Sequence, residues 1–445
     1  MSGCLIDGLP SEILSQIFVI LNGASLYARS ICDTSYGPID YPTLLSHICS
    51  RWRHIALSTP YLWSYIDYTT AGNTLQRLGR VNRYLHRSHN APLRVRFGTY
   101  NDGCVRQDIE PRVESLLRSG APRLESLAIS YYHSSFAKQT LSTVASGSVT
   151  TPLTTLALLA HSGDKRIIAD SEDLSQDDLN RLLEPLQNLY MDSVSPDWNH
   201  LACRNLVELH LLDLPMNGIP NAQQLVSLLK VNPTLRSIRL WRFLHNFVPP
   251  EPVLQSIRLP DLEHLDLNMD PRFVDWFISI LIPGSHDLEI SLASWAVSNR
   301  PNITNTFLAL CNRARITSLH ISGDWISLSH FYDYLPYLRT LRLSSQMLLE
   351  STLAGLHEAA HPFPQLETLE IIACARGGGG FNWLRTICAI RSFGMIKFRH
   401  LELYLSGRKM KPEEIIELFT EGCGSCKVQV VHSLELDLLS YPSPF

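Results

Sequence analysis

Three residues in the sequence have the types and spacing of a zinc hydrolase site. His357, Glu358 and His361 follow the pattern in which two histidines one helical turn apart bind the metal and the glutamate acts as general base. The extended form of this motif needs a glycine and a third histidine at positions that hold Pro364 and Glu367. A zinc hydrolase is therefore the weakest of the three functions that the sequence leaves open.

The other patterns that suggest chemistry are incomplete. Cys423 and Cys426 form a single Cys-x-x-Cys without a second pair of zinc ligands. The glycine run 377–380 is not followed by the Lys-Ser/Thr of a phosphate-binding loop, and the acidic stretch 170–178 lacks the glycine and final glutamate of a calcium loop. We therefore predict a protein that is not an enzyme and holds no metal or cofactor.

The composition excludes several classes of protein. Of the 445 residues 45% are hydrophobic and 18% charged, which is enough apolar surface for a large core. The net charge of −4 gives no basic excess for nucleic acid, and no apolar run approaches the roughly 18 residues of a membrane span. The apolar stretch 13–21 lacks the basic start of a signal peptide, and the ten cysteines have no framework spacing. We expect an intracellular protein, cytoplasmic or nuclear.

The elements that must position any binding site follow a repeat. A hexamer with apolar residues at its first, fourth and sixth positions recurs in eleven steps of about 28 residues, often after a proline. Its last two apolar positions alternate with polar ones, as in a half-buried strand, and stretches with helical spacing lie between the hexamers. The hexamers begin at Leu124, Leu153, Leu186, Leu206, Leu235, Leu262, Ile316, Leu338, Leu366, Phe398 and Val431, with a degenerate copy at Leu288.

This pattern resembles a leucine-rich repeat of irregular length. The resemblance implies an α/β solenoid, with a parallel sheet on the concave face and helices or loops outside. Polar residues that alternate with the core leucines should project from the sheet, and their aromatic, arginine and carboxylate types suit a client protein. The predicted client-binding residues are Arg239, Trp241, His264, Asp266, Asn268, His320, Arg342, Glu370, Glu402 and Tyr404.

The first seventy residues follow a different pattern. Leu9-Pro10-Ser11-Glu12 opens a helix, Cys49 and Trp52 lie on a later one, and Leu62-Trp63 closes the segment. Together these residues resemble an F-box, over about sixty residues and in the order usual for that family. The segment 22–43 is longer than the usual connection, so a short second helix there is uncertain.

The F-box resemblance implies a partner, because so small an apolar helical unit would leave hydrophobic surface exposed. In the family that partner is a Skp-type adaptor, which bridges to a cullin and a ubiquitin-conjugating enzyme. The adaptor-binding residues that the resemblance implies are Leu9, Pro10, Ile13, Leu14, Ile17, Phe18, Ile48, Cys49, Trp52, Leu62 and Trp63. Trp52 and Trp63 are expected to be partly internal. The alternative is an ordinary capping unit that packs on the repeats.

The two patterns divide the chain into three parts. Residues 1–68 are predicted to form the F-box-like helical domain, 69–91 a solvated linker helix with arginines on one side, and 92–445 the solenoid, whose first strand is 92–97. The sequence thus favours a non-catalytic substrate-recognition subunit of a Skp–cullin ubiquitin ligase. A repeat scaffold that binds proteins without meeting a ligase stays open. We expect no nucleic-acid or membrane partner.

Overall fold

The protein has a mixed α/β fold with parallel sheet structure. The computed structural model describes residues 5–27, 40–69, 74–98, 111–131, 134–147, 152–161, 175–215, 218–242, 256–293, 304–322, 334–345, 365–374, 395–402, 404–405, 408–409 and 427–431. These residues fall into two compact units divided between Leu206 and Val207, which we call the N-terminal and C-terminal units.

The N-terminal unit begins with helices that pack on one another. They are η1 (Leu5–Gly8), α1 (Ser11–Tyr27), α2 (Tyr41–Ile48), α3 (Ser50–Leu57) and the 3₁₀ helix η2 (Pro60–Trp63). Asp40 caps α2 by accepting a hydrogen bond from the Thr43 amide at 3.1 Å, and Pro42 fits the first turn of that helix. The helix that the long 22–43 connection left uncertain is therefore present.

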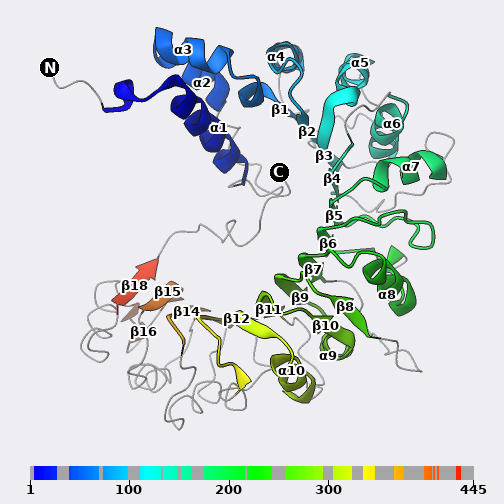
Figure 1. Cartoon of the computed structure of the whole chain (residues 1–445), viewed down its shortest axis with the longest axis vertical. Helices are drawn as coiled ribbons and strands as arrows, with labels where there is room; N and C mark the ends of the chain where they lie inside the picture. The colour runs from blue at the N-terminus through cyan, green and yellow to red at the C-terminus, as the bar shows by residue number, and fades with distance from the viewer. Residues whose placement is uncertain are drawn as a thin grey trace. The chain divides into compact units, whose positions relative to one another are not determined.

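Parallel strands follow, each joined to the next by a crossover that contains a helix in every case. The order is β1 (Tyr65–Thr69), α4 (Thr74–Arg87), β2 (Leu93–Gly98), α5 (Pro111–Gly120), η3 (Ala121–Arg123), β3 (Leu124–Tyr131), α6 (Ser134–Ala145), β4 (Thr155–Ala160), α7 (Gln176–Leu183) and β5 (Asn188–Asp192). Within this unit, α4 to α7 lie on one side of the strands (Figure 1).

The C-terminal unit also consists largely of parallel strands, some of them joined by crossovers that contain a helix. Its elements are β6 (Glu208–Leu212), α8 (Ala222–Lys230), β7 (Ser237–Trp241), β8 (Ile257–Leu259), β9 (His264–Asn268), α9 (Pro271–Ile280), β10 (Leu281–Pro283), β11 (Asp287–Ala293), α10 (Thr304–Cys311), β12 (Arg315–Ser322), β13 (Thr340–Ser345), β14 (Thr368–Cys374), β15 (Met395–Glu402), β16 (Tyr404–Leu405), β17 (Arg408–Lys409) and β18 (Lys427–Val431). Strands β6, β7, β9, β11 to β15 and β18 pair in parallel, while β8 pairs with β10 in a separate two-stranded sheet.

The register explains why these strands form a sheet with one buried face. Leu209 pairs with Ile238, Ile238 with Leu265, and Leu265 with Ile290, so each strand offers its apolar residue at the same level. The ladder continues through Leu319 and Leu341. All of these side chains are buried, because successive residues of a strand point to opposite faces and this face lies against the helices. The α/β fold class with a parallel sheet is confirmed.

Two details of the predicted organisation are wrong. The sheet begins at Tyr65, since β1 pairs in parallel with β2, so 92–97 holds the second strand and α4 is a crossover helix between two strands. In β15, Ile396 and Phe398 pair with Leu369 and Ile371 of β14. The predicted hexamer begins at Phe398, so its fourth and sixth positions, Leu401 and Leu403, were expected there instead. The reason is that several apolar residues in 395–403 fit a period of two equally well.

Candidate functional site

Exposed apolar side chains gather on the N-terminal helices. Of the eleven large apolar side chains exposed among the described residues, eight belong to α1, α2, α3 and η2. We call these eight the N-terminal apolar surface. Ile20 is 67% exposed, Ile48 54% and Leu44 52%. The full set is Ile13, Val19, Ile20, Leu21, Leu44, Ile48, Leu57 and Tyr61.

Helix α1 has two neighbouring apolar stripes that face different surroundings. Leu14 and Phe18, one turn apart, are fully buried, and Phe18 packs on Trp52 with 4.9 Å between ring centroids. Ile13 and Ile20 stay exposed on the adjacent stripe, with the partly buried Ile17 between them. A helix that is apolar on both stripes has more hydrophobic surface than its own unit covers.

The structure corrects part of the predicted adaptor-binding set. Leu14, Phe18, Leu62 and Trp63 lie in the interior, at 1% exposure or less, and cannot contact a partner while this packing holds. The Trp63 Nε1 donates to the Ala56 carbonyl at 2.7 Å, which joins η2 to α3.

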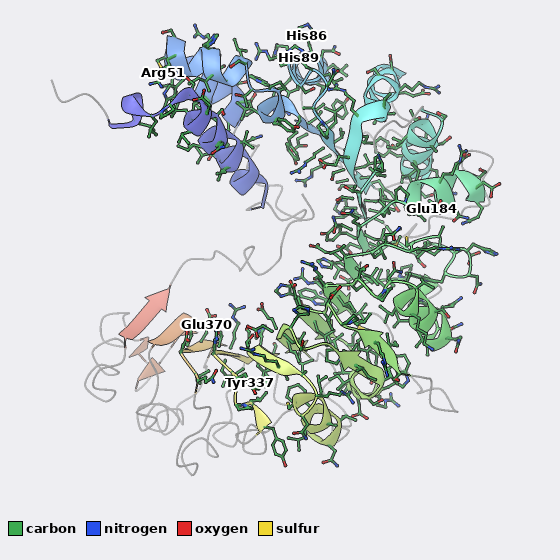
Figure 2. All side chains as sticks on the ribbon, viewed as in Figure 1. Arg51, His86, His89, Glu184, Tyr337 and Glu370 are labelled. Atoms are coloured by element: carbon green, nitrogen blue, oxygen red, sulfur yellow. The ribbon has the colours of Figure 1, made fainter. Side chains whose placement is uncertain are left out.

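The remaining predicted residues are accessible to different degrees. Pro10, Ile13, Ile48 and Cys49 are exposed, whereas Leu9, Ile17 and Trp52 are partly buried. Arg51, labelled in Figure 2, donates a hydrogen bond to the Leu9 carbonyl and joins α3 to the start of α1.

The predicted adaptor-binding residues do not include Ile20 and Leu44, two of the most exposed members of the N-terminal apolar surface. Ile20 continues the spacing Ile13–Ile17–Ile20, which is i, i+4, i+7 on one helix face, so the signal was present. Leu44 lies in α2, which the long 22–43 connection obscured.

In the C-terminal unit, the register brings the predicted client-binding residues into cross-strand pairs. On the face opposite the core leucines, Arg239 donates to Asp266 at 3.0 Å, and Arg342 donates to Glu370 at 2.6 Å. His320 shares a hydrogen bond with Ser291 at 3.1 Å. Because the strands are parallel and in register, residues at equal positions of successive repeats become neighbours.

Two of the predicted client-binding residues are buried in these pairs. Arg239 is 8% exposed and pairs with Asp266, and Glu370, labelled in Figure 2, is 2% exposed and pairs with Arg342. Burial raises the pKa of Asp266, although Arg239 opposes that effect. The prediction that Arg239 and Glu370 offer themselves to a client is corrected.

The other predicted client residues lie beside this row or outside the described side chains. Trp241 and Asn268 pair in register, and the Arg239 guanidinium lies 5.7 Å from the centroid of the Trp241 ring. His264 is exposed at the start of β9. Glu402 ends β15 and Tyr404 begins β16, but their side chains are not among those described.

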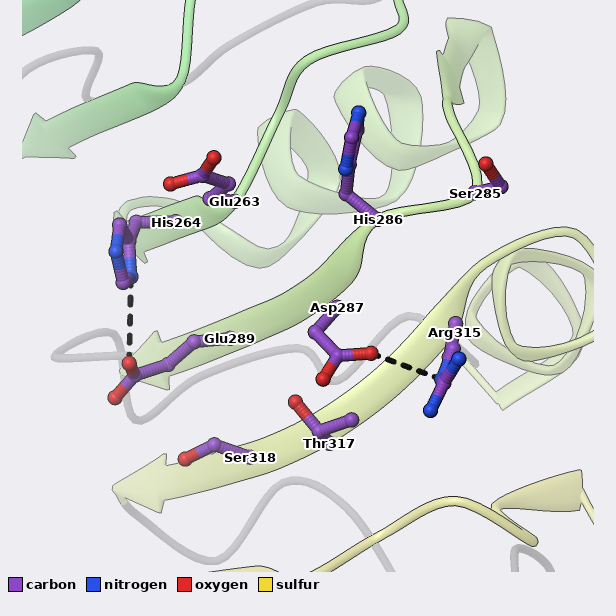
Figure 3. Close-up of a pocket in the computed structure, with 9 residues that line it drawn as sticks. All are labelled: Glu263, His264, Ser285, His286, Asp287, Glu289, Arg315, Thr317 and Ser318. Carbon is purple, nitrogen blue, oxygen red and sulfur yellow. Dashed lines mark ion pairs between the residues drawn. The ribbon is translucent and has the colours of Figure 1, made fainter.

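An open hollow of about 530 Å³ lies at the first residues of β9, β11 and β12 (Figure 3). Polar side chains line it and no apolar one does. We call it the polar pocket. Its members are Glu263, His264, Ser285, His286, Asp287, Glu289, Arg315, Thr317 and Ser318. Of the predicted residues only His264 belongs to it.

Strand register positions the polar pocket. His264 pairs with Glu289, and Asp287 with Arg315, so each strand contributes at its amino-terminal edge. The His264 Nδ1 lies 3.3 Å from Glu289 Oε2, and Arg315 Nε lies 2.8 Å from Asp287 Oδ1. Figure 3 shows these two ion pairs on opposite sides of the hollow.

The electrostatic environment of the pocket is negative. The Glu289 carboxylate raises the pKa of His264 through a hydrogen bond and through its charge, and Glu263 and Glu208 add to this effect against the opposing effect of burial. The same hydrogen bond lowers the pKa of Glu289. A positive charge is therefore stabilised at this position of the sheet.

The motifs that could carry catalysis lie outside the described residues. These are His357 to His361, the glycine run 377–380, and Cys423 with Cys426. Within the described ranges, no three His, Cys, Asp or Glu side chains come together in a way that could hold a metal ion. In the same ranges, no helix has the length and apolar character needed to cross a membrane.

Comparison of the chain with models of protein families and with curated proteins finds no match.

Proposed function

We propose that the protein is a non-catalytic receptor that joins a client protein to a Skp-type adaptor, and through it to a cullin ubiquitin ligase. The observation that carries this proposal is the N-terminal apolar surface, which lies in the segment whose sequence resembles an F-box. Exposed apolar side chains gathered on a few helices of one unit are typical of a protein interface.

The arrangement of the patch supports docking by side chains that are already exposed. Ile20 and Ile48 come from α1 and α2, two helices that pack on one another, and both side chains are exposed in the folded unit. A partner can therefore reach either one without unfolding the unit. Covering an isoleucine contributes about 1.5–3 kcal/mol per side chain. A few such residues are enough for a specific complex.

The receptor would act by position. The N-terminal unit holds the adaptor, the C-terminal unit holds the client, and proximity raises the effective concentration of client lysines near the conjugating enzyme. No bond chemistry is needed from this chain.

Co-purification of the full chain with a Skp-type adaptor tests the proposal. Ile20→Asp and Ile48→Asp should each weaken capture at least about 30-fold, since losing roughly 2 kcal/mol of apolar contact has that effect. Val231→Asp is the matched control, because Val231 is an exposed apolar residue in the C-terminal unit, at 49% against 54% for Ile48. Its capture should equal that of the unmodified chain.

The same experiment decides between the two protein-binding functions. If the adaptor does not co-purify, or if Ile20→Asp and Ile48→Asp capture it as well as Val231→Asp does, the ligase function is wrong. The alternative function, a repeat scaffold that binds proteins without associating with a ligase, is then the better explanation of the structure.

A further inference from the structure

The polar pocket offers acceptors that its own ion pairs leave available. The His264–Glu289 contact is 3.3 Å, and Glu263 lies 3.7 Å from Arg236. These are longer than the 2.7–2.9 Å of a strong charged hydrogen bond. Glu289 accepts hydrogen bonds from His264 and Ser318, and Arg236 lies beside Glu263. Because a carboxylate has about four acceptor positions, each of the two keeps some open to a ligand.

The charge of the hollow selects the class of ligand. Among the residues that line it, Glu263, Asp287 and Glu289 are anionic and Arg315 is cationic, so carboxylates outnumber the permanent positive charges of the lining. Arg236 pairs with Glu263 from outside the lining. All of these side chains are between about two fifths and three fifths exposed, so a ligand reaches them without any rearrangement.

The rim of the pocket is held rigidly. Pro283 and Leu259 pair in the β8–β10 sheet, and Gly284 then passes against the Pro260 backbone so closely that a Cβ there would lie 2.7 Å from the Pro260 carbonyl carbon. Ser285 and His286 follow immediately. The hollow is therefore preformed, which lowers the entropic cost of binding.

A protein partner, as opposed to a free ion, is favoured by the neighbouring aromatic residue. The Arg315 guanidinium lies 5.2 Å from the centroid of the Tyr337 ring, and Tyr337 is 44% exposed (Figure 2). An exposed tyrosine held in place beside a charged hollow is typical of an interaction hot spot.

We propose that the polar pocket binds a basic side chain, arginine or lysine, of the client protein, with Glu263 and Glu289 accepting its hydrogen bonds. The inference rests on the proposed function in one respect only, namely that the protein supplying the basic side chain is the client. A basic side chain pairs with carboxylates directly, and arginine can do so through two parallel hydrogen bonds.

Proton and ligand should compete. His264 faces Glu289 on β11, Glu263 before its own strand, and Glu208 and His210 on β6. A proton on His264 occupies the same negative field that a basic side chain would occupy. Binding should therefore tighten as the pH rises through the raised pKa of His264, and bound ligand should lower that pKa by linkage.

The test uses the full chain with ¹³C-labelled histidine, observed by NMR and titrated with N-acetyl-arginine methylamide, its lysine counterpart and its neutral citrulline counterpart. The arginine or lysine compound should shift the His264 signal, assigned by a His264→Gln variant, and the citrulline compound should not. Glu289→Gln should weaken the response about fivefold, as expected for a partly exposed ion pair. Glu184→Gln removes the same charge from the exposed end of α7 and should change nothing (Figure 2).

Three results would overturn the inference: equal shifts with citrulline and arginine, an unchanged response in Glu289→Gln, or shifts caused by inorganic phosphate in place of the cations. Adaptor capture by the same preparations separates this inference from the proposed function. If the chain binds the cations but does not capture the adaptor, the pocket inference stands and the proposed ligase function is wrong. If it captures the adaptor but does not bind the cations, the proposed function stands and the pocket inference is wrong.

Discussion

At Gly284 the backbone lies so close to another backbone segment that a side chain has no room. Gly284 joins β10 to β11 and passes directly against Pro260, whose carbonyl oxygen a Cβ would hit. Since the opposing atoms belong to the backbone, no rotation of a side chain can relieve this contact. The residue thus determines where the rim of the polar pocket lies.

Gly284→Ala should destabilise the protein by about 1–3 kcal/mol, the usual result of overpacking a filled site. Gly79→Ala is the matched control, because Gly79 lies inside α4 with no atom near its added Cβ, and alanine favours a helix by about 0.5–1 kcal/mol. Urea denaturation followed by circular dichroism should move the two midpoints in opposite directions. Equal midpoints would show that the approach of Gly284 to Pro260 is not rigid.

His210 is a buried titratable group that the proposed function does not use. It lies on β6, its Nε2 is 3.2 Å from the Ser237 hydroxyl, and burial together with the charges of Arg239 and His264 lowers its pKa well below the usual value. The folded protein therefore keeps His210 neutral, while the unfolded chain takes up a proton near pH 6.5.

The sign of the pH dependence follows from that difference. As the pH falls below about 6.5, the unfolded state binds a proton that the native state does not, so the free energy of unfolding decreases. His210→Gln, which can still bond to Ser237, should lose less stability than the unmodified chain between pH 8 and pH 5.5. Denaturation midpoints at the two pH values measure this. An identical pH dependence in both proteins would mean that His210 is protonated in the native state.

At the scale of elements, Asp40 fixes the start of α2 to the helix α4. Its carboxylate caps α2 and also accepts a hydrogen bond from the Tyr84 hydroxyl, and Tyr84 packs edge-on against Trp63 with 5.1 Å between ring centroids. The Arg87 guanidinium lies 4.3 Å from the centroid of the Trp63 ring. Burial and Asp40 together raise the pKa of Tyr84, so its hydroxyl stays a donor.

Asp40→Ala should therefore destabilise the protein more than the loss of an ordinary helix cap does. It removes a cap worth about 1 kcal/mol and a tertiary hydrogen bond worth about another 1 kcal/mol. Ser175→Ala, which removes only the local cap of α7, should cost about 1 kcal/mol. In a double-mutant cycle, Tyr84→Phe should cost less when Asp40 is already alanine. Additive changes in the urea midpoint would contradict the link between α2 and α4.

At the scale of the whole molecule, the two proposed sites belong to different units. The N-terminal apolar surface draws on α1 to η2, and the polar pocket on β9 to β12. Neither shares a residue with the other. Substitutions in one site should leave the other unaffected, which is why adaptor capture and cation binding can be measured as separate properties of one chain.

The sequence by itself determined most of the repeated strands and the inner face of the sheet. The alternation of Leu209 with Leu211, repeated in each hexamer up to Leu369 with Ile371, is strand periodicity, and it puts these residues on one face whatever else the chain does. Local spacing carries that periodicity, so it could be found without coordinates. The parallel pairing was implied by the resemblance to a leucine-rich repeat.

Tertiary structure alone decided which apolar stripe of α1 is covered. Ile13 and Leu14 are adjacent and equally apolar, so propensity cannot choose between their stripes, whereas packing against Trp52 and the neighbouring helices buries Leu14 and leaves Ile13 exposed. The polar residues depended on register in the same way. Arg239 meets Asp266, and His264 meets Glu289, only because parallel strands about 25 residues apart align at one level, and sequence distance does not encode that contact.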